Sequence, residues 1–407
     1  MKKYDLIVVG GGVAGVAAAV CGARHGLHTL LIEKFGSLGG AMTNSLIYPF
    51  MRHAKDNGKV PLSAGIFTEM KQRMTAYDDT SWECYRFVFD DMVNEAGVDV
   101  LFHATVFEAV RADRRITSVR TATKSGVRDF AADFFIDASG DGELMAMAGC
   151  DCQLGRDSDG YCQPMTTCFR VADVDRAAFA KDHDRVQKLY TEYREAGKLT
   201  NPRENILLFW GLGDGICHFN TTRVVKLSPV DPFEVSRAEM IARKQVYEMY
   251  TFMKNNAAGF EKSTIISIAS HIGVRESRKL RGVHILTADE LIGFTHFDDT
   301  IALGNYDIDI HSPTGTGTSF HFFGDDECYE IPYRSLLPTE YDNMLVAGRC
   351  LSATHEAHSA VRIIPICACL GQAAGTAAAL ARDTGTNAHT LDVKELQNLL
   401  KADGAAL

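Results

Sequence analysis

The sequence DLIVVGGGVAG at residues 5–15 decides the fold of this chain. A helical run follows as far as Gly26, and TLLIE at residues 29–33 comes next. An apolar strand, a Gly-x-Gly-x-x-Gly turn, a helix, a second strand and a terminal acid form, in this order, the pattern of a dinucleotide-binding βαβ unit. The agreement of all five parts is more specific than the glycine turn alone.

The three glycines and the terminal acid of this pattern each have a physical role. Gly10 allows the tight turn, Gly12 lets the backbone approach a pyrophosphate, and Gly15 lets the helix pack close to the strand. The anion then meets free N–H groups at the helix N-terminus, where the helix dipole favours negative charge. Glu33 is placed to accept hydrogen bonds from ribose hydroxyls. We therefore predict a bound adenine dinucleotide, and the motif leaves open which one.

Length and composition indicate a globular protein. The 407 residues are enough for two domains, and 46% hydrophobic with 23% charged residues is ordinary globular composition. Lysine and arginine number 42 against 52 acids, which gives a net charge of −10. This balance argues against non-specific binding to nucleic acids or anionic membranes.

Two segments imitate membrane signals. The N-terminal MKK followed by apolar residues resembles a signal peptide, but Asp5 interrupts the apolar region. Residues 363–381 are apolar and small, but Pro365, Gly371 and Gln372 suit a buried helix better than a membrane span. We expect no targeting segment, no membrane association and a cytoplasmic location.

The 11 cysteines are spread along the chain without any Cys-x-x-Cys. The close pairs are Cys150 with Cys152 and Cys367 with Cys369. We expect reduced packing thiols, and neither a Cys-x-x-Cys redox disulfide nor an iron–sulfur cluster with local ligand spacing. No metal site is predicted.

The first 150 residues contain further predicted elements. Gly39 and Gly40 follow the second strand where a long cofactor would pass, and residues 44–62 form a long loop. Ser63 is expected to cap one helix, and Thr80 or Ser81 the next. The other predicted elements are helices at 63–76, 80–96 and 143–148, a strand at 98–102, an antiparallel meander at 105–110, 116–121 and 127–130, and a buried strand at 132–138.

A block with a different pattern follows. Residues 174–197 and 232–257 are predicted helices, the second opened by Asp231 with Pro232 at its first position. Short strands are expected at 203–227, 263–273 and 299–330, with a Gly-Thr-Gly-Thr turn at 315–318. The chain then gives a strand at 341–350, a small-residue helix from Pro365 and a short helix at 391–403. The irregular middle block predicts a second, sheet-containing domain.

Four separated blocks, in this order, resemble the FAD-dependent oxidoreductase family with the glutathione-reductase-type FAD-binding fold. They are residues 10–33, 39–40, 134–142, and 344–349 together with 361–379, and RESR at 275–278 resembles an element of one branch. The resemblance implies an α/β fold: a Rossmann-like, three-layer FAD/NAD(P)-binding domain with an antiparallel β-meander and an inserted α+β substrate domain. The implied divisions are 1–152 and 331–407 for the FAD-binding domain and 153–330 for the insertion.

The resemblance also implies contacts to FAD along the chain. A nicotinamide dehydrogenase would not need the C-terminal return, and the sequence holds one full Gly-x-Gly-x-x-Gly, so we expect FAD and no second dinucleotide domain. The implied contacts are Gly10, Gly12, Ala14 and Gly15 at the pyrophosphate; Glu33 and Lys34 at the adenosine ribose; Gly39, Gly40 and Thr43 along the ribityl chain; Val106 at adenine; Ala138 and Gly140 at the adenosine end; Gly348 and Arg349 at ribitol and phosphates; and the helix that holds Gly371 at the flavin pyrimidine ring.

One position departs from the common family pattern. Many relatives have Gly-Asp where this chain has Gly348-Arg349. Arg349 either neutralises the pyrophosphate or forms a surface ion pair, and the sequence leaves both readings open.

The candidates for chemistry are histidines and arginines. His311 and His321 flank the Gly-Thr-Gly-Thr turn, and a histidine is the most economical proton acceptor near neutral pH. Arg275 and Arg278 lie three residues apart, and they either clamp a carboxylate or enolate oxygen or pair with Glu276 or the acids at 298–299. His355 and His358 lie between the late strand and helix, where they could edge the flavin.

These features predict an FAD-dependent oxidoreductase that transfers a hydride between a small organic substrate and flavin N5. Substrate dehydrogenation with His311 as base is preferred to reduction of an activated double bond with an arginine as acid or clamp. A flavoprotein electron-transfer component without its own turnover is the alternative from another class. The expected partners are the substrate and an unidentified electron acceptor or donor, and the substrate and oligomeric state are open.

Overall fold

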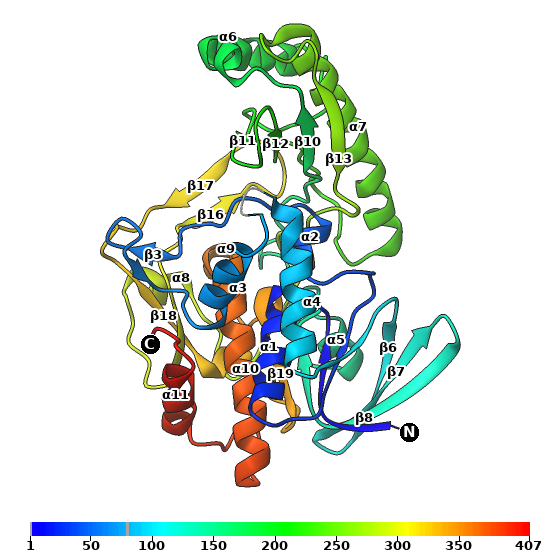
Figure 1. The fold of residues 1–407 in the computed structure, drawn as a ribbon, viewed down its shortest axis with the longest axis vertical. Coiled ribbons are helices and arrows are strands. Elements are labelled where there is room, and N and C mark those ends of the chain that lie inside the picture. The colour runs from blue at the N-terminus through cyan, green and yellow to red at the C-terminus, as the bar shows by residue number, and fades with distance from the viewer. Residues whose placement is uncertain (1, 79–80) are drawn as a thin grey trace.

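The computed structural model describes residues 2–78 and 81–407. A mixed seven-stranded sheet organises the first unit, in the order β5-β2-β1-β8-β7-β6 with β19 also paired to β8 (Figure 1). The parallel strands are β1 (Lys2–Val9), β2 (Thr29–Ile32), β5 (Asp99–Leu101), β8 (Gly126–Asp137) and β19 (Met344–Val346). The antiparallel meander adds β6 (Thr105–Ala112) and β7 (Arg115–Thr123) to β8.

The strand β8 corrects one expectation. The third meander strand and the buried strand were predicted as separate elements, but they form one strand of 12 residues. Residues 126–131 pair with β7, whereas residues 130–137 pair with β1. The change of neighbour exposes the first half and buries the second, which is why the sequence pattern looks like two strands.

Helices α1 (Val13–Arg24) and α10 (Ile364–Thr384) pack side by side on one face of this sheet (Figure 1). A Cβ atom at Gly371 would lie 2.1 Å from the carbonyl oxygen of Ala14, and one at Gly375 would lie 2.2 Å from that of Ala18. The backbones of the two helices therefore touch, and glycine is the residue that permits this approach. The prediction of a small-residue helix opened by Pro365 is confirmed.

Within the described chain, α10 is the one helix that is long and apolar enough to cross a membrane by length and composition, and 94% of its most apolar window is buried in the protein. Helices α3 (Ile66–Met74) and α4 (Tyr85–Glu95), with the 3-10 turn η1 (Trp82–Cys84), contribute buried side chains to the same core. Gly65 rather than Ser63 precedes α3, so the predicted Ser63 cap is wrong. Ser81 precedes η1 without a side-chain cap bond, and Thr80 lies outside the described residues.

The meander and α5 (Glu143–Ala148) cover the other face of the sheet. Ile7, Val9 and Phe135 of the sheet belong there to a second hydrophobic cluster with Val119 of the meander and Met145 of α5. The result is helices, sheet and meander in three layers, which confirms the predicted fold class.

The second unit is an antiparallel sheet covered by two long helices (Figure 1). Its hydrophobic cluster is separate from those of the first unit. Asp231 accepts hydrogen bonds from the N–H groups of Phe233 and Glu234, at 3.0 and 2.9 Å, which confirms the predicted helix start at Pro232. The sheet order is β11 (Leu208–Phe209), β12 (Cys217–Phe219), β10 (Phe169–Ala172) and β13 (Thr264–Ile268), and the helices are α6 (Arg176–Glu195) and α7 (Pro232–Asn256).

Short elements connect the two units. The hairpin β16 (Ile308–His311) and β17 (Thr318–His321) contains the predicted Gly-Thr-Gly-Thr turn, and β15 (Thr300–Gly304) with β18 (Tyr329–Pro332) packs into the core around α10. The domain boundaries after residues 152 and 330 stay a prediction. The remaining elements are β3 (Ala54–Lys55), β4 (Val60–Pro61), β9 (Cys152–Leu154), β14 (Arg278–Leu280), α2 (Ala41–Asn44), α8 (Ala288–Ile292), η2 (Tyr333–Leu336), η3 (Gly348–Cys350), α9 (His355–Val361) and α11 (Val393–Ala402).

The contact between α1 and α10 predicts a sharp effect at Gly371. Gly371→Val should lower the free energy of unfolding by about 1–3 kcal/mol, because the new side chain forces the helices apart. Gly315→Ala is the control, since a Cβ there meets nothing within 4 Å, and it should stay within about 0.5 kcal/mol. Urea unfolding measures both, and equal stabilities would contradict the packing role of Gly371.

Candidate functional site

The fingerprint glycines take the conformations that their predicted roles require. Gly10 has φ +100°, and a Cβ there would lie 2.6 Å from the carbonyl oxygen of Ala138. A Cβ at Gly15 would lie 1.8 Å from the carbonyl oxygen of Gly10, so the helix and the turn are in backbone contact. Gly12 precedes α1 without a side-chain cap, and the first turn carries no acid. The first N–H groups of α1 are therefore left for an anion.

The Glu33 carboxylate holds the turn together from inside. Its two oxygens accept hydrogen bonds from the N–H groups of Gly11, at 2.6 Å, and Phe35, at 2.8 Å. Burial raises the pKa of Glu33, and these two bonds oppose the rise. Each carboxylate oxygen accepts one of these bonds and has capacity for a second, so contact with ribose hydroxyls stays a prediction.

The second glycine pair closes onto the first. The Gly39 N–H donates to the carbonyl of Gly11 at 2.8 Å, and a Cβ at Gly40 would lie 2.8 Å from the Cα of Gly12. The Thr43 hydroxyl donates to the carbonyl of Leu38 at 2.6 Å. These segments form one glycine-lined edge, as expected for the path of a long cofactor.

The other implied contact residues lie on neighbouring elements. Lys34 pairs with Glu143 at 2.8 Å, and Val106 is buried on β6. The Ala138 N–H donates to Val9 of β1 at 2.8 Å, and Gly140 follows with φ +79°. Their contact with a cofactor stays a prediction.

The C-terminal return reaches the fingerprint at Gly348. This residue has φ +80°, and a Cβ there would lie 2.8 Å from the Cβ of Ala14. The next side chain, Arg349, is 17% exposed and pairs with Asp141 at 2.8 Å. Its second nitrogen donates to the carbonyl of Val274. Arg349 thus forms a mostly buried ion pair rather than a surface one, and its role toward a pyrophosphate stays a prediction.

A comparison with protein families agrees with this geometry. The model of the family described as FAD dependent oxidoreductase matches residues 5–400. This chain belongs to that family. FAD is the cofactor that the family name implies, and the glycine-lined edge with the uncapped N-terminus of α1 fits its pyrophosphate. When bound, FAD supplies a hydride acceptor or donor.

Curated relatives match this FAD-dependent oxidoreductase over part of their length. Mitochondrial dihydrolipoyl dehydrogenase from Schizosaccharomyces pombe is 30% identical over 148 residues, which cover 33% of this chain and 27% of the relative. Glutathione reductase from the same organism is 28% identical over 188 residues, which cover 42% and 39%. The chain thus spans well under half the length of these relatives.

All eleven cysteines of this chain are free.

Among solved structures, a geranylgeranyl bacteriochlorophyll reductase-like protein from Thermoplasma acidophilum aligns with 100% of this chain and 85% of its own, at 15% identity and a TM-score of 0.47. The flavin-dependent brominase Bmp2 covers 98% and 83%, at 10% identity and a TM-score of 0.49.

The two predicted histidines have different surroundings. His311 is 8% exposed, whereas His321 is exposed and lies against Phe323. The Arg223 guanidinium can only donate, so the His311 Nδ1 atom, 3.3 Å away, must accept, and Nε2–H is left to face Asp309 at 3.4 Å. Burial and the charge of Arg275 lower the pKa of His311 to about 3. His311 is therefore a neutral imidazole with both nitrogens engaged.

The two predicted arginines point to different places. Arg275 donates to the carbonyl of Pro164, at 2.8 Å, and to the Thr166 hydroxyl, on the side of the second unit. Arg278 donates to the carbonyl of Asp141, at 3.2 Å, beside the glycine turn of the first unit. The structure therefore does not bring the two side chains together as a clamp. The alternative acids are used elsewhere, because Asp299 pairs with Arg334 and Glu276 with Lys279.

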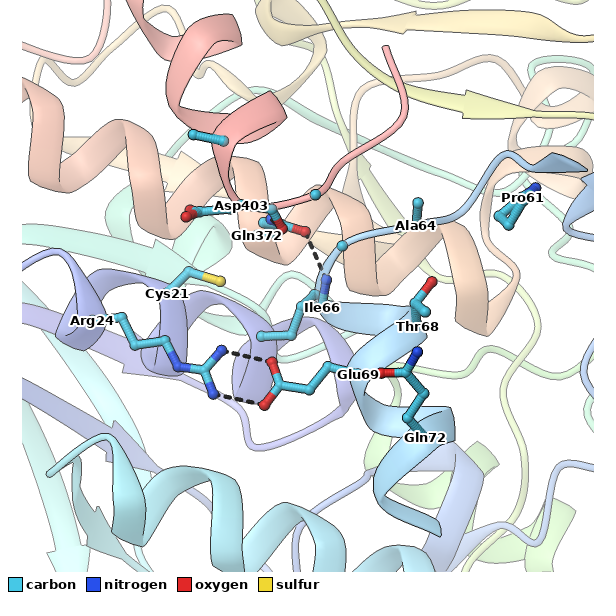
Figure 2. Close-up of a pocket in the computed structure, with 13 residues that line it drawn as sticks. Cys21, Arg24, Pro61, Ala64, Ile66, Thr68, Glu69, Gln72, Gln372 and Asp403 are labelled. Atoms are coloured by element: carbon cyan, nitrogen blue, oxygen red, sulfur yellow. Dashed lines mark hydrogen bonds and ion pairs between the residues drawn. The ribbon is translucent and has the colours of Figure 1, made fainter. Parts of the chain in front are cut away.

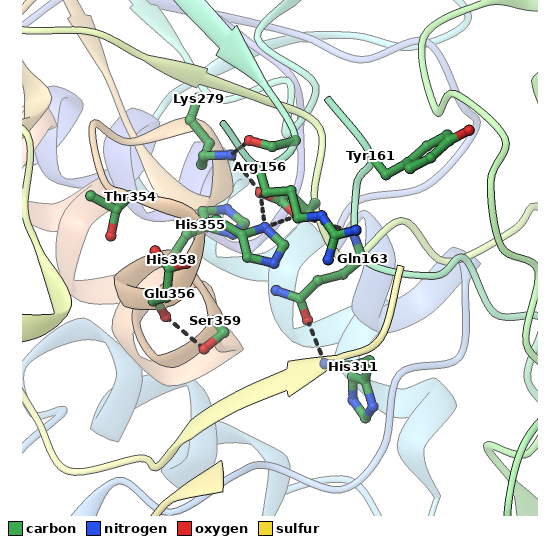
Figure 3. Close-up of polar contacts among 12 residues, drawn as sticks. Arg156, Tyr161, Gln163, Lys279, His311, Thr354, His355, Glu356, His358 and Ser359 are labelled. Carbon is green, nitrogen blue, oxygen red and sulfur yellow. Dashed lines mark hydrogen bonds and ion pairs between the residues drawn. The ribbon is translucent and has the colours of Figure 1, made fainter. Parts of the chain in front are cut away.

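A buried cluster that joins Glu276 to Lys279 and His355 was not expected from the sequence; Figure 3 labels Lys279, His355 and His358. Glu276 and Lys279 are both 0% exposed and form an ion pair. His355, at the start of α9, places Nδ1 within 2.8 Å of the same carboxylate, and His358 Nε2 lies 2.7 Å from the carbonyl of Arg349. Burial opposes charge on Glu276, but the hydrogen bond from His355 and the charges of His358 and Lys279 outweigh it and lower the pKa of Glu276 to about 2.

One ring nitrogen of His355 is left without a partner in this geometry. Because the Glu276 carboxylate accepts, Nδ1 of His355 carries a proton, and in the neutral imidazole Nε2 is then the nitrogen with the lone pair. The Nε2 atom is buried and has no partner in the described part of the chain. Gln163 lies between His355 and His311 (Figure 3): its N–H donates to Glu276 at 2.9 Å, and its side-chain oxygen lies 3.4 Å from the N–H of His311.

A cavity of about 600 Å³ is lined by residues of α1, α3, α10 and the C-terminal segment (Figure 2). It is open at the C-terminal end of α1, where Arg24 and Glu69 form a bidentate ion pair with both distances 2.7 Å. None of the predicted site residues lines it. We therefore do not assign the chemistry to this cavity.

The position of Glu33 predicts a loss of cofactor retention in Glu33→Ala. The substitution leaves the N–H groups of Gly11 and Phe35 without their acceptor, at about 1–3 kcal/mol each. The Kd for FAD should rise by about tenfold or more, measured by flavin release on dilution. Glu108→Gln, on an exposed part of β6, is the control and should keep the wild-type Kd. Wild-type retention by Glu33→Ala would refute this role.

The Glu276 cluster predicts a defined dependence of stability on pH. A carboxyl whose pKa is lowered on folding, here from 4.5 to about 2, stabilises the protein above pH 4.5, and this contribution is lost as the pH falls toward 2. Glu276→Gln should cost about 3–5 kcal/mol at pH 7, and its deficit should narrow as the pH falls through this window. Denaturant unfolding at several pH values measures the deficit, with exposed Glu195→Gln as control. A deficit independent of pH would contradict the assignment.

Proposed function

We propose that this FAD-dependent oxidoreductase dehydrogenates a small organic substrate. The observation that carries the proposal is the His355 imidazole, which Glu276 holds at 2.8 Å and whose Nε2 atom is buried without a partner. A carboxylate that fixes one nitrogen and leaves the other free is the arrangement of an oriented general base. His355 begins α9, the helix that directly precedes α10, whose N-terminus the family resemblance directs at the flavin.

Dehydrogenation removes a hydride and a proton from the substrate, and each needs its own acceptor. Bound FAD would supply the hydride acceptor, Nε2 of His355 takes the proton from the substrate, and the charge that forms on the imidazole is stabilised by Glu276. Lys279 keeps this carboxylate ionised, since its ammonium forms a buried ion pair with it. His311 has both nitrogens engaged and a lowered pKa, which suits a substrate contact better than the role of base.

Two other functions remain distinguishable by experiment. Reduction of an activated double bond would use the same histidine in its protonated form as the proton donor. An electron-transfer component would need an exposed route to a protein partner. The burial of His311 and His355 supports a small substrate instead.

The test is an anaerobic screen of purified holoenzyme against a panel of small metabolites, read as bleaching of the flavin absorption. We expect bleaching by at least one saturated substrate. Bleaching by none, together with rapid oxidation of the photoreduced protein by an unsaturated compound, would instead establish the reductase. Oxidation by a protein partner but by no small molecule would establish the electron-transfer role.

The role of His355 is tested with the substrate that the screen identifies. His355→Gln should keep FAD and slow flavin reduction by about 10²–10⁴-fold in stopped-flow measurements, because the proton loses its acceptor. His183→Gln, on the exposed surface of α6, is the matched control and should keep the wild-type rate. An unchanged rate in His355→Gln would remove this residue from the mechanism.

A further inference from the structure

Four arginines gather around His311 from distant parts of the chain. Arg203 precedes β11 and Arg223 follows β12 in the second unit, Arg275 precedes β14, and Arg362 lies between α9 and α10. Burial, together with repulsion from Arg203, Arg362 and Arg223, lowers the pKa of Arg275 to about 9. Direct contacts tie two of them to the histidine: Nη2 of Arg223 lies 3.3 Å from His311 Nδ1, and Nη2 of Arg362 donates at 3.3 Å to the Gln163 side-chain oxygen, which lies 3.4 Å from the His311 backbone nitrogen.

The acids around this cluster do not balance its charge. Glu204 pairs with Arg223 at 3.0 Å, and Asp309 faces His311 and accepts a hydrogen bond from Tyr306 at 2.9 Å. Four guanidinium groups thus face two carboxylates in the described part of the chain. Two further arginines nearby are already neutralised, Arg170 by Glu83 and Arg52 by Asp307.

Several donors in the cluster have no acceptor or only neutral ones. Arg203 is 5% exposed, and its Nη1 atom is buried without a partner among the described residues, as is Nε of Arg362. The contacts of Arg275 are all neutral oxygens, including Asn220 at 3.3 Å. A buried charged donor without an acceptor is costly, so these atoms indicate a missing anion.

The FAD pyrophosphate is not the anion that these arginines await. It is expected at the start of α1, beside Gly12, whereas Arg203 and Arg223 belong to the second unit. Arg362 directly precedes the N-terminus of α10, so the cluster lies on the side where the flavin ring is expected. The anion that fits these arginines is therefore the substrate itself.

We propose that the substrate is a small organic dicarboxylate, bound by Arg203, Arg275 and Arg362 with Arg223 and His311 behind them. This proposal rests on the proposed function, because it names the substrate class of the same site. The flat guanidinium fork matches the two oxygens of a carboxylate, and two carboxylates balance the excess of positive charge. A phosphate group also offers negative oxygens to these arginines, so the experiment includes inorganic phosphate as a separate probe.

The test measures binding to oxidised holoenzyme, which needs no turnover. Malonate, succinate, acetate and inorganic phosphate are each titrated in low-salt buffer, with the flavin difference spectrum and the Tm as readouts. We expect malonate or succinate to perturb the flavin spectrum and to raise the Tm, since a ligand that binds the folded state stabilises it. Acetate should bind at least tenfold more weakly, and phosphate should leave the flavin spectrum unchanged.

Variants locate the site. Arg203→Gln and Arg362→Gln should each raise the Kd of the dicarboxylate by tenfold or more, while Arg203→Lys, which keeps the charge, should lose less. Arg243→Gln, an arginine on the exposed part of α7 paired with Glu239, is the matched control and should keep the wild-type Kd. Without added anion, removal of a repelled charge should keep or raise the Tm of Arg203→Gln and Arg362→Gln.

Three results would overturn the proposal: no response of the wild type to millimolar dicarboxylate, tighter binding of phosphate than of any dicarboxylate, or equal weakening in Arg243→Gln. A lowered Tm of both glutamine variants without anion would also overturn it, since the arginines would then be structural. Dicarboxylate binding with no bleaching by any metabolite would refute only the proposed function. Bleaching by a neutral metabolite without anion binding would refute only this proposal.

Discussion

The backbone contact between α1 and α10 is the constraint on which the rest of the structure depends. Gly371 and Gly375 meet the carbonyl oxygens of Ala14 and Ala18, which joins the first helix of the chain to one of the last. Contacts of such long sequence separation cost loop-closure entropy, and the burial of two small-residue helix faces offsets that cost. The same contact brings Gly348 against Ala14, so the fingerprint and the C-terminal return share one site.

Two buried charge clusters border this site and differ in how they are balanced. Glu276 has Lys279 and His355 within direct contact, so its negative charge is compensated inside the protein. The arginines around His311 outnumber the neighbouring acids, and some of their donor atoms have no partner among the described residues. The chain carries a net charge of −10, so this positive cluster is opposite in sign to the protein as a whole. A buried cluster with excess positive charge favours a ligand of opposite charge.

The sequence predicts those parts of the fold that depend on local patterns. The fingerprint, the Asp231-Pro232 helix start and the helix at Pro365 each combine a conformational preference with a turn or cap nearby, and the structure has them in place. The single strand β8 was missed because its two halves have different neighbours. The Glu276 and arginine clusters were missed for a related reason. Each cluster joins segments that lie far apart in the chain, such as residues 275–279 with His355 and Arg203 with Arg362, and local spacing does not show which segments meet.

The partners of an imidazole decide its chemical role, as His311 and His355 show. His311 stands beside a glycine turn, which suggests function from sequence, but Arg223 and Asp309 engage both of its nitrogens. His355 has less sequence context, yet Glu276 orients it and leaves Nε2 free. Since Gln163 contacts both Glu276 and the backbone of His311, a substrate held by the arginines would lie within reach of the free imidazole. In the proposed mechanism the anion-binding arginines and the base meet at Gln163, which contacts Arg362, Glu276 and the backbone of His311, so anion binding would tie the second unit to the flavin side.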